Sequence, residues 1–309
     1  MHLIRGLNRW PDRVATVVTM GNFDGAHRGH QAMFSALQSA AEQHEAPSTV
    51  LSFDPLPHEY FSQLPSPPRL QGLRDRVRSL KEASLDRFVL VKFDRAFAEQ
   101  RADEFIRETL VNRLNARHLV IGDDFRFGHK RQGTFELLEE ASKKYGFTLQ
   151  RSPTCEHEGR RISSTLIREN LAAGNLEEAA VLLGRQYRIS GRVIHGEKVG
   201  RQLGFPTANV SLGKHQPPLR GVFAVIAKDL ESGKSFPAVA NLGERPTIGG
   251  RKLLLEVHVL DQSVHWYGHH LAIDFLSQLR QEIRFESLDE LKAQIAQDAD
   301  DARQMIGTR

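Results

Sequence analysis

Cysteine is nearly absent from this sequence, since Cys155 is the only one among 309 residues. An intrachain disulfide is therefore excluded, which fits a reducing compartment such as the cytoplasm. A lone cysteine is more often a small buried hydrophobe than a nucleophile, and nothing around Cys155 argues for a reactive thiol. Cys155 is therefore not a candidate for chemistry.

Long apolar runs are also missing, because no segment approaches the roughly 18 apolar residues that a membrane span needs. The first residues, MHLIRGLNRWPDR, lack the apolar core of a secretory signal peptide. A hydrophobic share of 40% and a charged share of 26% are ordinary for a globular protein. We therefore expect a cytoplasmic protein of two domains with no membrane partner.

Net charge is small, since 42 Lys and Arg face 38 Asp and Glu, which leaves +4. The stretch 160–201 contains eight Lys or Arg and four Glu, so it accounts for the whole excess. A chain that is basic throughout, as many non-specific nucleic-acid binders are, is thus excluded. We expect one anion-facing region and no nucleic-acid partner, although ordinary fluctuation of surface charge would give the same pattern.

Strand-like and helix-like segments alternate through the first half. Short runs rich in branched apolar residues predict five strands, at 14–20, 48–53, 87–93, 117–122 and 147–151. Apolar periodicity predicts the helices between them, at 29–44, 73–83, 102–114 and 134–145. This alternation is typical of βαβ units in an α/β fold, with a parallel sheet covered on both faces.

The second half changes character after two short predicted helices, at 163–172 and 175–183. Gly- and Pro-containing turns then separate five β-like runs, which predict an antiparallel barrel and lie at 187–195, 221–227, 236–241, 253–260 and 271–275. A capping box, Ser287 with Glu290, begins a final amphipathic helix over 287–305. We place the domain boundary near 183–186, which gives domains 1–184 and 185–309.

The first candidate phosphate site follows the first predicted strand, where parallel sheets bind ligands. The segment GNFDGAHRGH runs from Gly21 and Asn22 into the next helix, whose first N–H groups favour anions. Gly29 lets a phosphate approach the backbone closely. His27 and His30 lie on one face of the first turn and can neutralise charge that grows on a phosphate during transfer.

Other interpretations of this segment stay open. Two histidines at this spacing can bind a metal, although a third ligand is usually needed. They can also be surface residues without a role. A dinucleotide-binding loop is disfavoured, because the segment lacks G-x-G-x-x-G.

A second group of candidate phosphate ligands opens the helix predicted at 163–172. The hydroxyls of Ser163, Ser164 and Thr165 suit both a helix N-cap and phosphate oxygens. Arg168 follows one turn later, and its guanidinium can hold a phosphate through two hydrogen bonds. An ordinary capped helix would show the same residues.

A glycine-rich basic segment, GRVIHGEKVGRQLGFPTAN, covers 191–209. It is not a Walker A loop, because no G-K-[ST] ends it and no helix follows. Such a turn can still present several N–H groups to a phosphate chain. Thr207 and Asn209 offer hard oxygen ligands for Mg²⁺. The alternative is a flexible β-hairpin without a ligand.

Glu256 lies in an otherwise apolar predicted strand, LLLEVHVLD at 253–261. If the strand alternates, Glu256 shares a face with Leu254 and His258. A carboxylate in this position lies either at a functional cavity or on a solvated face. The pattern alone favours the solvated face.

Eight segments in this order resemble the bacterial bifunctional riboflavin kinase/FMN adenylyltransferase family, also called FAD synthetase. They are TMGNFDGAHRGH (19–30), FDPLPHEYF (53–61), IGDDFRFGHKRQG (121–133), ISSTLIR (162–168), GRQLGFPTANV (200–210), NLGERPTIGG (241–250), LEVHVLD (255–261) and LRQEIRF (279–285). The resemblance implies a Rossmann-like nucleotidyltransferase domain with a parallel sheet. It also implies a C-terminal antiparallel β-barrel riboflavin kinase domain closed by a C-terminal helix.

The resemblance implies two successive reactions. The barrel would transfer the γ-phosphoryl group of MgATP to the riboflavin 5′-hydroxyl and give FMN. The first domain would join the FMN phosphate to the α-phosphorus of ATP and give FAD and pyrophosphate. The implied partners are riboflavin, FMN and ATP, and the implied cofactor is Mg²⁺ with ATP. The oligomeric state is left open.

In the first domain, the resemblance implies that the segments 19–30 and 162–168 bind the ATP phosphates. Their candidate ligands are Gly21, Asn22, His27, Gly29, His30, Ser163, Ser164, Thr165 and Arg168. Of these, His27, His30 and Arg168 are the catalytic candidates. The loop 123–128 resembles the part that holds FMN and ATP, with Asp124, Phe125 and Arg126 as flavin-binding candidates. Some relatives have Asn in place of Asp124. Since an anion repels phosphate, adenosine hydroxyls or Mg²⁺ are the expected partners of Asp124.

In the barrel, Glu256 resembles the general base that takes the proton of the riboflavin hydroxyl. Thr207 and Asn209 resemble the Mg²⁺ and phosphate ligands. The loop expected over the ATP phosphates contains Gly196, Lys198 and Gly204. The segment near the flavin contains Arg280, Glu282 and Phe285, and Phe285 could either stack on the flavin or belong to the core.

Two other functions are compatible with parts of the sequence. A flavin-binding or delivery protein could keep the fold without turnover, but both complete motif sets speak against it. A nucleotidylyltransferase with a different acceptor would keep the first motif, and the barrel motifs weigh against it.

Overall fold

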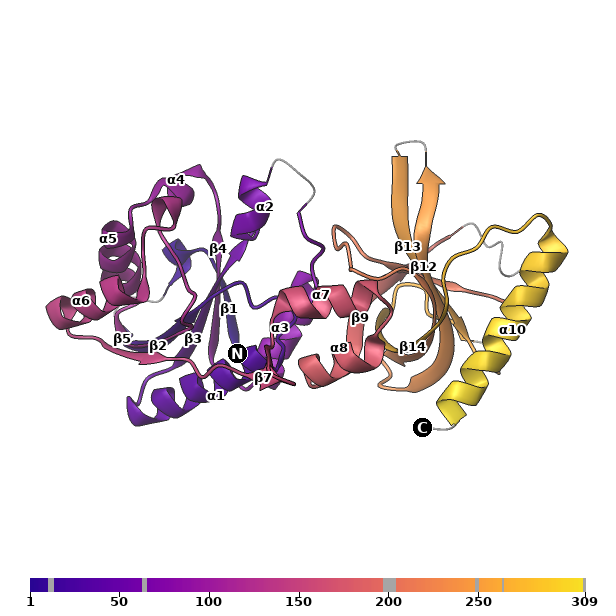
Figure 1. The fold of residues 1–309 in the computed structure, drawn as a ribbon, viewed down its shortest axis with the longest axis horizontal. Coiled ribbons are helices and arrows are strands. Elements are labelled where there is room, and N and C mark those ends of the chain that lie inside the picture. Colours follow the sequence, from indigo (N-terminus) through magenta and orange to yellow (C-terminus); the bar gives the residue numbers. More distant parts are fainter. Residues whose placement is uncertain (11–13, 63–65, 197–203, 248–249, 263, 308–309) are drawn as a thin grey trace. The chain divides into compact units, whose positions relative to one another are not determined.

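The computed structural model describes residues 1–10, 14–62, 66–196, 204–247, 250–262 and 264–307. Its contacts divide the chain into two compact units. One consists of residues 1–67 and 76–162, and the other of residues 68–75 and 163–309. Both are drawn in Figure 1.

The first unit is built on a six-stranded sheet in the order β1-β4-β3-β2-β5-β6, in which all neighbours are parallel. The strands are β1 (His2–Arg5), β2 (Thr16–Met20), β3 (Ser48–Asp54), β4 (Arg87–Lys92), β5 (Ala116–Ile121) and β6 (Thr148–Arg151). Every residue of β2 is buried, as expected for a strand covered on both faces. The predicted α/β fold is therefore confirmed, with β1 as an additional edge strand.

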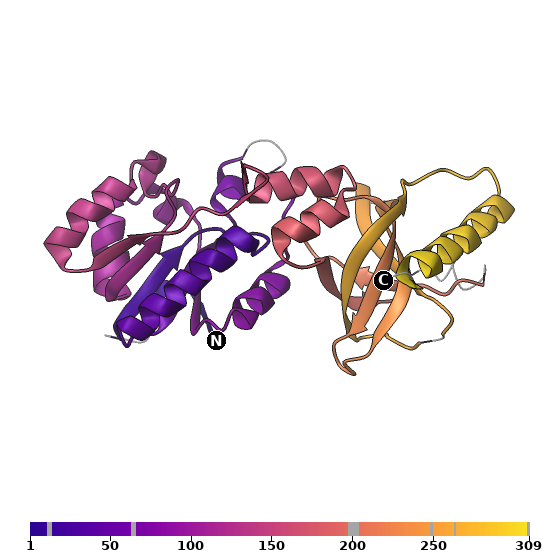
Figure 2. The same ribbon diagram turned by 60° about the horizontal axis from the view of Figure 1, so that its bottom comes forward.

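Helices connect these strands, and Figure 2 shows α1 lying along the sheet. They are α1 (Arg28–Gln43), α2 (Pro57–Phe61), α3 (Leu73–Glu82), α4 (Arg95–Glu99), α5 (Ala102–Glu104), the π-helical segment η2 (Phe105–Arg113) and α6 (Phe135–Tyr145). The unit also contains two short 3₁₀ turns, η1 (Leu7–Arg9) and η3 (His129–Arg131). It is completed by a hairpin of β7 (Glu156–His157) and β8 (Arg160–Arg161). Within the described part of the chain, each helix is too short or too polar to cross a bilayer.

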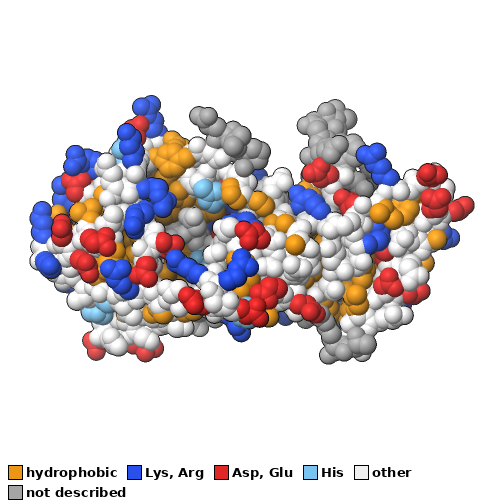
Figure 3. Space-filling model, in the orientation of Figure 1, with side chains coloured by type: hydrophobic (Ala, Val, Ile, Leu, Met, Phe, Trp, Pro, Cys, Tyr) orange, Lys and Arg blue, Asp and Glu red, His pale blue; other side chains and the backbone are white. Residues whose placement is uncertain are grey.

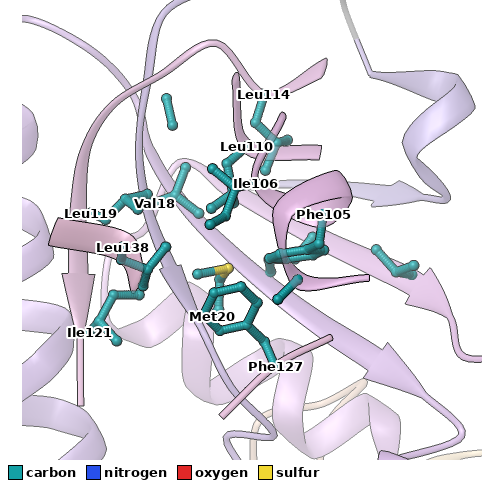
Figure 4. Close-up of a cluster of buried hydrophobic side chains, with 14 of the residues drawn as sticks. Val18, Met20, Phe105, Ile106, Leu110, Leu114, Leu119, Ile121, Phe127 and Leu138 are labelled. Carbon is teal, nitrogen blue, oxygen red and sulfur yellow. The ribbon is translucent and has the colours of Figure 1, made fainter. Parts of the chain in front are cut away.

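One hydrophobic core fixes the carboxyl ends of β2 and β5, as Figure 4 shows. Met20 of β2 and Ile121 of β5 are buried in one cluster with Leu110 of η2 and Leu138 of α6. Dispersion contacts in such a core hold strand ends in place. The loops that leave β2 and β5, at 21–27 and 122–128, therefore start from fixed and neighbouring points.

The second unit contains a closed barrel in the order β10-β13-β12-β11-β14-β9, with all pairs antiparallel. Its strands are β9 (Tyr187–Ile194), β10 (Ala208–Ser211), β11 (Gly221–Asp229), β12 (Ser235–Thr247), β13 (Gly250–Val259) and β14 (His270–Arg280). The C-terminal helix α10 (Leu288–Gly307) packs on this barrel, with Ala299 and Ala302 beside Ala224 and Leu260. The predicted barrel with a closing helix is confirmed.

Helices α7 (Ser164–Ala172) and α8 (Leu176–Leu183) fall in the second unit, where α8 contacts β9 and β14. The compact units and the predicted domains 1–184 and 185–309 therefore divide the chain at different places. The predicted domains follow the change of sequence pattern, whereas the units follow packing. The boundary at residues 184 and 185 stays a prediction.

Candidate active sites

The loop between β2 and α1 has a backbone that favours anions. Phe23 and Ala26 have φ angles of 49° and 42°, and Gly25 has 94°. Left-handed residues within a turn can direct successive N–H groups into one concave site, and the first turn of α1 adds its own N–H groups. The Phe23 ring is buried against His30 and Phe34, at centroid distances of 5.3 and 5.2 Å. This packing holds a backbone conformation that is otherwise unfavourable.

His27 and His30 lie together at the start of α1. Their rings stack with centroids 3.6 Å apart and planes at 18°, so the prediction that they share one face is confirmed. His27 caps the helix, because its Nδ1 accepts a hydrogen bond of 3.3 Å from His30 N. Neutral His27 therefore carries its proton on Nε2 and can donate it to a ligand. Among the described residues, no third metal-ligand side chain joins this pair.

The loop after β5 lies beside α1, since a Cβ added to Gly122 would lie only 3.5 Å from Cε of Met33. Asp123 pairs with Arg151 at 3.1 Å, and Asp124 pairs with Arg161 at 3.0 Å, both at the surface. Arg161 thus balances the negative charge of Asp124. Two arginines therefore anchor the acidic end of this loop.

The flavin-binding candidates Phe125 and Arg126 differ in their surroundings. Phe125 is half-buried and stacks on Phe127, with centroids 5.7 Å apart. Arg126 is exposed and donates to the carbonyl of Phe125. The position of Phe125 therefore depends on the core, whereas Arg126 is held only locally. Their flavin contacts stay a prediction.

An exposed aromatic cluster in this unit was missed by the sequence reasoning. Tyr60 and Phe61 of α2 pack edge-on against Phe93, at 5.4 and 5.6 Å, although Tyr60 is 39% and Phe61 62% exposed. Neighbouring ring contacts continue from Phe93 to the loop after β5 through Phe97, Phe105, Phe127 and Phe125. Exposed rings that are rigidly supported are suited to stack on a flat aromatic ligand. The segment FDPLPHEYF contains the signal, as three of its nine residues are aromatic.

The second phosphate segment opens α7. Ser163 is its N-cap, with Oγ accepting a hydrogen bond of 3.2 Å from Leu166 N. Arg168 Nε donates to the carbonyl oxygen of Pro68 at 2.7 Å. The capped helix is therefore confirmed. Phosphate binding by Ser163, Ser164, Thr165 and Arg168 stays a prediction.

Glu256 lies on β13 between two asparagines. Its register partners are Asn209 on β10 and Asn241 on β12, and side chains at such positions are neighbours. Glu256 is half-buried together with Leu254 and His258, whereas the residues between them are buried, so the predicted alternation is confirmed. Asn241 Oδ1 is buried without a hydrogen-bond partner. Since buried polar atoms are nearly always bonded, this oxygen is a candidate acceptor for a donor on a ligand or a water molecule.

The glycine-rich segment and the PTAN element meet at Asn209. A Cβ on Gly196 would overlap the Asn209 side chain, so only glycine leaves room for this buried amide. Gly204 is exposed at a φ of 89°, which favours glycine. Lys198 lies outside the described residues. Gly196, Asn209 and Glu256 are therefore brought to one region of the barrel.

A small pocket lies beside this region. Its lining includes Val193 and Val257 of the strands, Thr207 of the PTAN element, and Trp266 and Tyr267 of the segment before β14. The Tyr267 ring also stacks on His195 at 4.3 Å. A pocket that combines valine and aromatic side chains with the hydroxyls of Thr207 and Tyr267 is suited to the face of a flat heterocycle. Sequence reasoning did not select Trp266 or Tyr267, although HWY at 265–267 is the most aromatic stretch of the second half.

The predicted flavin segment is tied to the C-terminal helix. Arg280 forms two hydrogen bonds with Asp298, at 2.8 and 2.7 Å, and lies over the ring of Phe285 at 5.8 Å. Glu282 is exposed, and its carboxylate occupies the space that a Cβ on Gly243 would need. Arg280 thus has a structural role, because its guanidinium binds the carboxylate of Asp298 on α10. Flavin contact by Arg280, Glu282 and Phe285 stays a prediction.

The Asp298→Ala variant is expected to lose about 3 kcal/mol of unfolding free energy, because it leaves a largely buried guanidinium without its carboxylate. Urea-induced unfolding of the full chain measures this loss. The matched control is Asp300→Ala, which removes a carboxylate of α10 that pairs with Arg303 near the surface and should change the midpoint little. Equal midpoints for the two variants would contradict the structural role of the Arg280–Asp298 pair.

Among the described residues, one cluster has the composition of a metal site, namely Asp229, Glu231 and His269. Burial acts to raise the pKa of Asp229, but hydrogen bonds from Ser232, the Glu231 N–H and His269 outweigh it and lower this pKa to about 2. Asp229 accepts these bonds at the β11–β12 turn. We therefore interpret the cluster as a turn that its own side chains stabilise.

Comparisons with known proteins cover both units. Residues 11–166 match the family model of FAD synthetase, and residues 183–306 match that of riboflavin kinase. A bifunctional riboflavin kinase/FMN adenylyltransferase of Haemophilus influenzae is 48% identical over 305 residues, 98% of each chain. The protein of the same name from Escherichia coli K12 is 45% identical over 309 residues, 99% of this chain and 98% of that one.

A solved structure agrees over the same length. It is titled as a macrolide-efflux protein from Streptococcus pneumoniae and matches with a TM-score of 0.84 at 30% identity, covering 97% of this chain and 98% of that one. Its title applies to that protein, whereas the fold is shared. The family models and the curated relatives agree with both motif sets, and they do not favour a delivery protein or another acceptor. The chain therefore belongs to the family of bifunctional riboflavin kinases/FMN adenylyltransferases and has both enzymatic activities.

Proposed function

We propose that the barrel makes FMN at Glu256 and that the loop 21–30 makes FAD. The observation that supports the first assignment most strongly is the position of Glu256 between Asn209 and Asn241. We also propose that the protein is cytoplasmic and that its partners are small molecules, with neither nucleic acid nor a membrane among them. The single cysteine and the nearly balanced charge support them.

In the barrel, Glu256 accepts the proton of the riboflavin 5′-hydroxyl as its oxygen attacks the γ-phosphorus of ATP. The pocket with Trp266 and Tyr267 holds the adenine ring, and Thr207 lies at the phosphate side of that pocket. Asn241 Oδ1 accepts a hydrogen bond from the bound substrate. These groups act mainly by holding the reacting oxygen and the phosphate in line.

The residues of the PTAN element fit Mg²⁺. The Thr207 hydroxyl and the side-chain carbonyl oxygen of Asn209 are hard ligands. The absence of a side chain at Gly196 leaves room for the Asn209 amide. When bound with ATP, the ion supplies positive charge to the phosphate oxygens. Lys198 and Gly204 belong to the loop that we assign to the same phosphates.

In the first unit, the FMN phosphate attacks the α-phosphorus of ATP, and pyrophosphate leaves. This phosphate is already ionised near neutral pH, so no side chain has to remove a proton. His27, through Nε2, and His30 donate to the oxygens on which charge grows, and the N–H groups of the loop do the same. Arg168 and the hydroxyls of Ser163, Ser164 and Thr165 bind the ATP phosphates, and the rings of Tyr60 and Phe61 stack on the flavin.

The purified chain is expected to convert riboflavin and ATP into FMN and then FAD, and to stop when EDTA removes the divalent ion. Loss of that charge should lower phosphorylation at least about a hundredfold. HPLC of the flavins follows both steps, and FMN given as substrate isolates the second. Addition of MgCl₂ beyond the EDTA should restore both rates. Undiminished FMN formation in EDTA would contradict the assignment of Mg²⁺ to Thr207 and Asn209.

A further inference from the structure

Two buried side chains hold the backbone carbonyl of Asn22. Arg76 Nη1 donates to this oxygen at 3.1 Å, and Ser52 Oγ donates to it at 3.3 Å. Arg76 Nη1 also donates to Ser52 Oγ at 3.3 Å, so the three groups form a closed triangle. Ser52 is 0% and Arg76 2% exposed. The carbonyl of the phosphate loop is thus fixed from inside the unit.

This contact determines where the next N–H points. In a trans peptide the C=O and N–H groups point in opposite directions, so an inward Asn22 carbonyl turns the Phe23 N–H outward. Phe23 itself has a φ of 49°, a left-handed conformation that bulky residues seldom adopt. Ser52 and Arg76 therefore stabilise the orientation in which the loop presents a donor to an anion.

Arg76 is well suited to this task from its place on α3. It donates to Phe53 O at 3.4 Å as well as to Asn22 and Ser52, and its guanidinium lies over the Phe88 ring at 5.6 Å. A guanidinium has five donors in a fixed fork, so it can bridge the end of β3 and the loop after β2 at once. Burial of this cation is costly, and its positive charge beneath the loop adds to the attraction for phosphate.

We propose that Ser52 and Arg76 are positioning residues for FMN adenylylation. They orient the Asn22–Phe23 peptide toward the phosphates of ATP and act through the loop without touching the substrate. This inference rests on the proposed assignment of the loop 21–30 to the ATP phosphates. It adds to that site two residues that lie outside the HxGH motif.

Ser52→Ala in the full chain tests the proposal with a small change. We expect kcat for FMN adenylylation to fall about tenfold, while the KM for FMN stays within about twofold and the kinase rate is unchanged. The matched control is Ser48→Ala. Ser48 is equally buried on the same strand, but it donates to Asp86 at 2.8 Å from the opposite end. It should lose similar thermal stability without a change in kcat.

Arg76→Lys is the second variant, because it keeps the buried charge and loses the fork. Its kcat should fall further, about thirtyfold, with normal riboflavin phosphorylation in the barrel, and thermal unfolding of the variant measures the fold of the first unit. An unchanged kcat in both Ser52→Ala and Arg76→Lys would overturn the proposal, as would an equal loss in Ser48→Ala. If His30→Ala also makes FAD normally, the assignment of the loop itself fails. If only His30→Ala is impaired, the positioning role alone is wrong.

Discussion

Glu256→Gln is expected to abolish FMN formation while the same protein still converts added FMN into FAD. The amide keeps the size of the carboxylate but cannot accept the proton of the riboflavin hydroxyl, so the rate should fall about a thousandfold. Asn209 and Asn241 flank the position on neighbouring strands and should tolerate an amide there. Time courses of riboflavin, FMN and FAD by HPLC, started separately with riboflavin and with FMN, measure both steps.

The control for this variant is Glu231→Gln, which changes an exposed carboxylate at the β11–β12 turn of the same unit. It should keep both activities. An equal loss of the two reactions in Glu256→Gln would refute separate sites, and normal FMN formation would remove Glu256 as the base. Glu256→Ala should behave as Glu256→Gln does, because both remove the proton acceptor.

Much of the fold could be predicted because its strands are short and apolar, with periodic helices between them in the first unit and turns between them in the second. The strands that were missed are too short for a pattern, since β1 and β10 have four residues each and β7 and β8 have two each. Pairing with β4 orders β1, and pairing with both β9 and β13 orders β10. These contacts join residues that are distant in sequence, so local pattern cannot reveal them.

In the candidate sites too, features that local spacing fixes could be predicted, and features that depend on tertiary contacts could not. His27 and His30 could be placed together because three residues of helix fix their spacing. The pairing of Arg280 with Asp298, the ring contacts of Phe61 and the orphan oxygen of Asn241 depend on the fold around them. A motif therefore predicts which residues share a turn, and tertiary structure decides what each one contacts.

The basic stretch 160–201 illustrates this limit. Figure 3 shows basic and acidic side chains interspersed over the visible face. Within the stretch, Arg161 pairs with Asp124, and Arg188 pairs with Asp274 on β14. At least two of its cations are thus neutralised by partners from other elements. The excess charge of this stretch is a count of its residues and does not show which of them bind phosphate. Among its described residues, Arg168 stays the best candidate for binding phosphate.

His30→Ala is expected to reduce FAD formation from FMN about a hundredfold and to spare FMN formation. It removes a donor from the oxygens on which charge grows, and one such donor contributes about 10²–10³ in rate. The helix cap survives, because His27 Nδ1 accepts from the backbone N–H of residue 30, which alanine keeps. Circular dichroism and thermal unfolding report on the fold of the variant, the kinase rate reports on the barrel, and HPLC of FAD with FMN and ATP gives kcat and KM.

His44→Ala is the matched control for this variant, since His44 ends the same helix and also stacks on a histidine, His118, at 5.0 Å. It removes a ring of the same kind at the far end of α1 and should leave both rates unchanged. Loss of FAD formation in both variants would mean that damage to α1 is the cause. Normal FAD formation in His30→Ala would exclude His30 from the site. A defect confined to His30→Ala would place the transfer of AMP at the amino end of α1, where the loop, the helix N–H groups and the histidine pair meet.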